Sequence, residues 1–161
     1  MSRRSEALAR RIEQGADELA AFAQTISDAE WSMAQKGSDK RTVGVIVNHV
    51  ASIYPVEIDV VRAIASGKAV TDVTWGAVAE LNANHARENA AAAKPATLEL
   101  LRKNSREAAA AVRALTDEEL DQSAPFSLSY GAPMTAQFVV EDHPLRHPWH
   151  HLARIRALLG R

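Results

Sequence analysis

Hydrophobic side chains recur every three or four residues along four long stretches of this 161-residue chain. Because an α-helix has 3.6 residues per turn, this spacing places the apolar residues of each stretch on one helical face. The four predicted helices cover residues 2–27, 42–67, 95–115 and 135–161, and in the last of them Phe138 shares the apolar face with Leu145 and Leu152. Thr42 is suited to cap the second of them and Gly67 to end it, whereas Pro55 in its interior predicts a kink. Four apolar faces of this kind can bury one another in a bundle.

The segments between the four helices have weaker patterns. Residues 28–41, with Trp31, Gly37 and Ser38, indicate a surface connection that Trp31 anchors. Residues 75–93 are polar and rich in alanine, which favours a short helix over one side of the core. Two shorter features are a capped turn at residues 116–119 and a turn region at 123–133, in which one interpretation of FSLSY is a brief extended piece. We therefore predict an all-α fold, an antiparallel four-helix bundle with an additional short helix, formed by residues 1–161 as a single domain.

Composition and charge limit the class of protein. The hydrophobic and charged fractions, 47% and 24%, are typical of a soluble globular chain. A net charge of -1 argues against a nucleic acid or an anionic membrane as partner and favours a small-molecule substrate. No uninterrupted apolar run is long enough to span a membrane, and the first residues lack the apolar core of a signal peptide, so a cytoplasmic location is expected. The chain has no cysteine, so imidazoles and carboxylates have to provide any chemistry.

Four of the six histidines are crowded into residues 143–151. His147 and His151 are four residues apart, so on a helix they share a face and could bind the same metal ion. His49 lies at the margin of the second helix's apolar face, and a bundle could bring it opposite that pair. Three neutral imidazoles would leave an open coordination position, as in catalytic metal sites. The alternatives are a solvated or helix-capping cluster for the pair and a hydrogen-bonded core residue for His49.

The prolines and the extra histidines complicate this site. Pro148 stands between the paired histidines, where it predicts either a bend or the start of a new helix. Pro144 makes the direction of His143 uncertain in the same way. His143 and His150 add two imidazoles that could also take part.

Other polar residues give weaker signals. Glu57 and Tyr54 follow His49 on the same predicted helix and could orient a ligand or transfer a proton, but the expected location of both is the surface. His85 lies in the polar 75–93 segment and is expected to be exposed. Glycine-rich nucleotide-binding patterns and the GxSxG pattern of serine hydrolases are absent from the sequence.

The sequence resembles the DinB-like, or DinB/YfiT-like, superfamily of four-helix-bundle metalloenzymes. The stretches that carry the resemblance are RTVGVIVNHVA, LNANHARENAAA, APMTAQFVVEDH and HPWHHLARIRALL. It implies a divalent metal ion held by His49, His147 and His151, and a homodimer. The family includes transferases and isomerases that use a low-molecular-weight thiol such as mycothiol or bacillithiol, as well as many members of unknown activity. In a chain without cysteine, such a thiol would have to be a cosubstrate. Arg154 stands where some members have glutamine.

Two functions therefore stay open. The first is a cytoplasmic enzyme in which three histidines hold Zn²⁺ or Ni²⁺, which activates water or a thiol for transfer or hydrolysis on a small molecule. The second is a non-catalytic helical binding or stress-response module whose histidines are structural. The first predicts that metal affinity declines from about pH 6 to pH 5, because an unperturbed histidine has a pKa of about 6.5. Alanine-rich faces in residues 77–93 and 97–115 add to the expectation of a homodimer.

Overall fold

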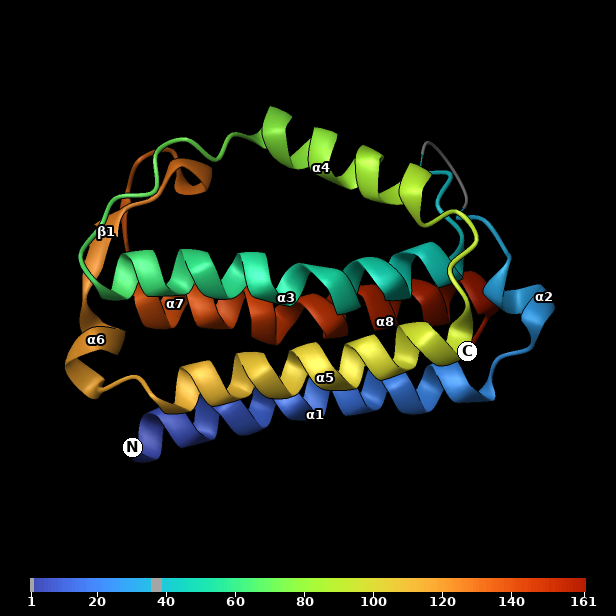
Figure 1. Ribbon diagram of the computed structural model, residues 1–161, viewed down its shortest axis with the longest axis horizontal. Coiled ribbons are helices and arrows are strands. Elements are labelled where there is room, and N and C mark those ends of the chain that lie inside the picture. The colour runs from blue at the N-terminus through green and yellow to red at the C-terminus, as the bar shows by residue number, and fades with distance from the viewer. Residues whose placement is uncertain (1, 36–38) are drawn as a thin grey trace.

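The computed structural model describes residues 2–35 and 39–161 and confirms the predicted all-α four-helix bundle (Figure 1). The bundle helices are α1 (Arg3–Thr25), α3 (Val43–Ala65), α5 (Lys94–Arg113) and a C-terminal segment of α7 (Ala136–Val140), a π-helical turn (Glu141–Leu145) and α8 (Arg146–Leu159). In Figure 1, α1 and α7–α8 run from left to right, whereas α3 and α5 run from right to left. Neighbours α1 and α5 are thus antiparallel, as are α3 and α8, whereas α3 and α5 run parallel.

Helix α3 forms as its sequence predicts. The Thr42 hydroxyl accepts a hydrogen bond from the backbone N–H of Val45, and Gly67, with φ of 76°, follows the last turn. Pro55 lies inside the helix without ending it. Apolar side chains from all four bundle helices fill the core. The largest fully buried side chains of the core are Tyr54, Phe126, Ile12, Leu19, Ile46, Ile64, Leu101, Leu120, Leu152 and Ile155.

The anchoring role predicted for Trp31 is confirmed. Trp31 ends the short helix α2 (Asp28–Trp31), is 8% exposed, and donates a hydrogen bond from Nε1 to the carbonyl oxygen of Ala92 at 2.9 Å. Its indole lies against Gly44 of α3, where only a glycine leaves enough room. Gly37 and Ser38, which belong to the same predicted connection, lie outside the described residues.

Substitution Gly44→Ala is expected to destabilise the protein by about 1–3 kcal/mol, the usual range for overpacking a core. An added Cβ would be 2.6 Å from Trp31 Cε2, and a rigid indole hydrogen-bonded to the backbone cannot move aside easily. In an exposed helix the same change would stabilise by up to about 1 kcal/mol. Gly76→Ala, where the nearest contact of a Cβ would be 3.7 Å, is the matched control. Urea unfolding of both variants measures the difference, and a Gly44→Ala protein as stable as the wild type would contradict this prediction.

The additional short helix is present as α4 (Trp75–Glu88), which lies over α3 in Figure 1 and buries none of its residues. The capped turn at 116–119 is the start of α6 (Asp117–Asp121), with Thr116 as its N-cap. The extended piece was placed wrongly, because the strands are β1 (Ser123–Pro125) and β2 (Pro133–Thr135), which pair antiparallel on either side of FSLSY. Tyr130 and Gly131, with φ of 58° and 80°, make the turn that brings the two strands together.

One apolar residue of the last helix differs from its predicted position. Phe138, predicted to face the core with the other apolar residues of that helix, is 38% exposed, whereas Val139 and Val140 are buried.

Helix α3 is long and apolar enough to cross a membrane by length and composition, with a mean hydropathy of 1.3. Of the 18 residues of α3 that have this mean hydropathy, 67% are buried inside the protein, as in the core helix of a bundle.

Candidate metal centre

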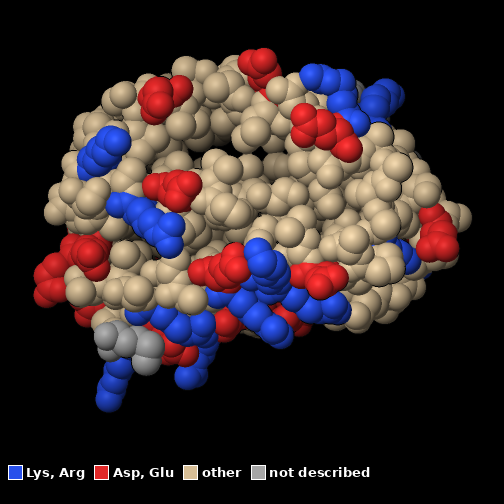
Figure 2. Space-filling model, viewed as in Figure 1, with Lys and Arg blue, Asp and Glu red and all other residues tan. Residues whose placement is uncertain are grey.

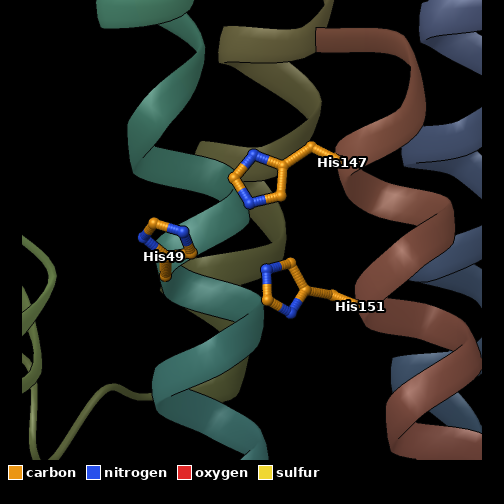
Figure 3. A group of neighbouring side chains, drawn as sticks. All are labelled: His49, His147 and His151. Carbon is orange, nitrogen blue, oxygen red and sulfur yellow. The ribbon is translucent and has the colours of Figure 1, made fainter. Parts of the chain in front are cut away.

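The structure brings three of the six histidines together between two helices. His49 on α3 points toward His147 and His151 on α8 (Figure 3). One possible ligand atom from each side chain lies within 4.8 Å of the other two. The centroid of the His49 ring lies 5.0 Å from that of the His147 ring and 5.6 Å from that of the His151 ring. Three nitrogen donors that converge in this way could hold one metal ion.

The C-terminal helix presents its two histidines in spite of two prolines. Pro144 lies in the π-helical turn, and Pro148 lies in the first turn of α8. The backbone N–H of Arg146 donates to the carbonyl oxygens of Glu141 and His143, so α8 continues directly from the π-helical turn and runs through Pro148. Pro148 is therefore not the first residue of a new helix, and the interruption of the regular α-helix lies before it, at Glu141–Leu145. His147 and His151 stay one turn apart, on the same face.

Burial keeps two of these imidazoles neutral. Removal from water, together with the charge of a protonated His147, lowers the pKa of His49 to about 3. The same two causes, burial first, lower the pKa of His151 to about 2. A neutral imidazole has a free nitrogen lone pair, which is the form that binds metals. At neutral pH these two side chains are therefore ready to act as ligands.

Glu57 is part of the site, which corrects the expectation that it lies on the surface. Its side chain is 7% exposed, and His147 Nδ1–H donates a hydrogen bond to Glu57 Oε1 at 2.7 Å. This contact fixes the tautomer of His147 so that Nε2 keeps its lone pair. The other carboxylate oxygen of Glu57 is buried and has no hydrogen-bond partner in the described part of the chain.

Tyr54 and His85 are also placed differently from the expectation. Tyr54 is buried in the core, and its burial raises the pKa of the hydroxyl above its usual range. His85 is half-buried, and its Nε2 lies 2.9 Å from Oδ1 of Asn48, the residue before His49. Asn48 in turn donates from Nδ2 to the Thr97 hydroxyl at 3.0 Å. His85 thus ties α4 to the helix that carries His49.

A cavity of about 390 Å³ opens beside the three histidines, within the usual size of small-molecule sites. His143 and His150 line it without joining the converging group. The ring of His143 packs edge-on against Phe126 at 5.7 Å, and burial lowers the pKa of His143. Arg154 turns away to Asp39, 3.5 Å from its carboxylate.

Comparison with known proteins agrees with the fold of this chain. A family model described as the DinB superfamily matches residues 11–155, whereas no curated protein matches. One similar solved structure is YfiT from Bacillus subtilis, which is described as a probable metal-dependent hydrolase with an unusual four-helix bundle topology. It is 17% identical to this chain with a TM-score of 0.75, and the match covers 99% of this chain and 90% of YfiT. A mycothiol-dependent maleylpyruvate isomerase is 15% identical with a TM-score of 0.70, covering 94% of this chain and 60% of the isomerase.

Proposed function

Because this chain belongs to the DinB superfamily, we propose that it is a metal-dependent enzyme in which His49, His147 and His151 hold a divalent ion and a small molecule reacts beside it. The convergence of three imidazoles from two helices beside a cavity is the observation that carries this proposal. Three ligands leave coordination positions open toward the cavity, as catalytic sites require. Glu57 supports the site by orienting His147 and by placing a carboxylate next to a cation.

Zn²⁺ or Ni²⁺ is the ion that the donor set fits best, because imidazole nitrogen is a good ligand for both and the chain has no thiolate to offer. Such an ion supplies Lewis acidity toward water or a thiol at neutral pH. The side chains of the protein bind the ion and the substrate. The lowered pKa values keep His49 and His151 from binding protons instead of the ion, and the cavity walls hold the substrate.

The reaction we propose is transfer, isomerisation or hydrolysis on a small molecule. One structural neighbour is described as mycothiol-dependent and the other as a probable metal-dependent hydrolase, which supports both classes. A thiol would enter as a cosubstrate, since the chain has no cysteine. The proposal includes a cytoplasmic location and a homodimer. For the dimer, the alanine-rich surface available is that of α4, because Ala108 and Ala109 of α5 are buried in the chain's own core.

Metal content tests the proposal against a non-catalytic module with structural histidines. Untagged wild-type protein is expected to carry about one equivalent of zinc or nickel by mass spectrometry of the elements. The His147→Ala/His151→Ala double variant is expected to lose at least about nine tenths of it, since one imidazole alone binds weakly. His150→Ala removes an exposed histidine from the same helix and is the control that keeps the metal. Equal metal contents in all three proteins would contradict the proposal.

A further inference from the structure

The cavity beside the histidines has two unlike ends. Its polar end is the histidine cluster, and apolar side chains of α3 and α4, together with Val73, Phe126 and Leu128, line the rest. In the space-filling view the surface is hollowed beneath α4, and the atoms around the hollow are mostly uncharged (Figure 2). The charged side chains of this face gather instead over α1 and α5.

Two apolar stripes line the long part of the cavity. Each stripe follows helical spacing, so it forms one continuous face of its helix. The lining residues are Ile53, Val56 and Val60 on α3 and Trp75, Val78 and Leu81 on α4. Trp75 is 59% exposed and Leu81 is 43% exposed, although both are large and apolar. Helix α4 thus gives its apolar side chains to the cavity and none to the core, which is the arrangement of a ligand-binding wall.

The cations at the cavity already have partners. Arg41 donates from Nε and Nη2 to the two carboxylate oxygens of Asp39, at 3.0 and 2.9 Å. Arg146 Nε lies 3.0 Å from Oδ1 of Asp142. Each guanidinium among the described lining residues is therefore paired with a carboxylate. An anionic group on the body of a ligand would have to compete with these ion pairs.

We infer that the cavity binds an amphipathic small molecule with an apolar, uncharged body that lies between the two stripes and one polar group that reaches the histidines. A rigid ring system or a branched chain fits two facing rows of valine, isoleucine, leucine and tryptophan. Burial of its apolar surface is the main favourable contribution to binding. The inference rests on the proposed function for the chemistry at the histidine end, whereas binding of the body does not require the metal.

A matched pair of fluorescent probes tests the chemistry of the body. N-phenylnaphthylamine is apolar and uncharged, and anilinonaphthalene sulfonate has the same rings with one anionic group. Titrations of metal-stripped protein are expected to give a dissociation constant for the uncharged probe at least about tenfold lower, because the sulfonate loses water without gaining a free cation. Equal or tighter binding of the sulfonate would overturn the inference.

Variants on α4 locate the binding. Val78→Asp places a carboxylate on the apolar wall and is expected to raise the dissociation constant of the uncharged probe at least about tenfold. Ala79→Asp introduces the same charge next to it, outside the cavity lining, and is expected to leave binding unchanged. Neither change puts folding at risk, because α4 buries no residue. Equal binding by both variants would place the probe elsewhere and overturn the inference.

Two further measurements separate this inference from its alternatives. The His147→Ala/His151→Ala protein is expected to bind the uncharged probe within about threefold of the wild type, so loss of metal with retained probe binding leaves the inference intact. If the wild type holds metal and yet excludes the probe, the inference fails while the proposed function stands. A lower molar mass of Leu81→Asp but not of Ala79→Asp by light scattering would assign the apolar opening, rather than the alanine-rich surface of α4, to an interface between two copies and would also overturn the inference.

Discussion

Acidification from pH 7 to pH 5 is expected to lower the free energy of unfolding of the metal-stripped protein by about 4 kcal/mol. Burial holds the pKa of His49 at about 3 and that of His151 at about 2 in the folded state, whereas an exposed histidine has the ordinary value of 6.5. Below pH 6.5 the unfolded chain therefore takes up protons that the folded protein does not. Each of the two histidines costs about 1.4 kcal/mol per pH unit, hence about 2 kcal/mol at pH 5.

Acidification destabilises the protein because the pKa values of His49 and His151 are lower in the folded protein than in the unfolded chain. The stabilisation by neutral, buried imidazoles is complete above pH 6.5 and decreases as the pH falls toward about 3. Urea unfolding at several pH values between 8 and 4 measures the slope. His151→Asn, which replaces the ring by an uncharged amide, is expected to remove about half of it, whereas His150→Asn, at an exposed position of the same helix, keeps most of it. Parallel curves for the wild type and His151→Asn would contradict the prediction.

The same shifts change the expected acid sensitivity of metal binding. An ordinary histidine pKa places the loss of metal between about pH 6 and pH 5. In the folded protein, protons compete for His49 and His151 only near their lowered pKa values of about 3 and 2. Loss of metal from these two ligands is therefore expected at lower pH than the sequence alone suggests.

Substitution Glu57→Gln is expected to weaken metal binding about 10–100-fold, the usual effect of removing a carboxylate that orients a ligating histidine. The carboxylate accepts the Nδ1–H of His147 and so keeps the Nε2 lone pair of that ring available. A glutamine has nearly the same shape, but its amide nitrogen can donate to Nδ1 and favour the tautomer that cannot bind the ion through Nε2. It also removes a negative charge beside the cation.

Competition with a chromogenic chelator measures this metal affinity. Asp59→Asn is the matched control, because it makes the same kind of change on an exposed turn of α3, where Asp59 pairs with Arg62 at 3.5 Å. Asp59→Asn is expected to bind metal like the wild type. If Glu57→Gln binds metal equally well while circular dichroism shows an intact bundle, Glu57 does not position His147 for an ion.

Local patterns were sufficient for most of the fold. The spacing of apolar residues identified the four bundle helices, and Thr42 and Gly67 bounded α3 because caps are local interactions. The extended piece was misplaced because the pairing of β1 with β2 depends on a turn at Tyr130 and Gly131, and the letters FSLSY do not reveal the left-handed backbone of that turn. Phe138 was assigned to the core because its helix was taken as regular, whereas a π-helical turn interrupts it after Val140.

Some residues of the candidate site were likewise indicated by local spacing, whereas others were placed there only by the tertiary structure. By itself the sequence indicated His147 and His151, since residues four apart on a helix share a face, and it singled out His49 at the edge of an apolar stripe. Only the tertiary structure decided that His49 lies within reach of that pair and that Glu57 is buried against a histidine 90 residues away. Periodicity describes the faces of one helix, whereas the pairing of faces from distant helices depends on how the whole core packs. The burial that lowers the histidine pKa values and the apolar wall contributed by α4 exist only after that packing is complete.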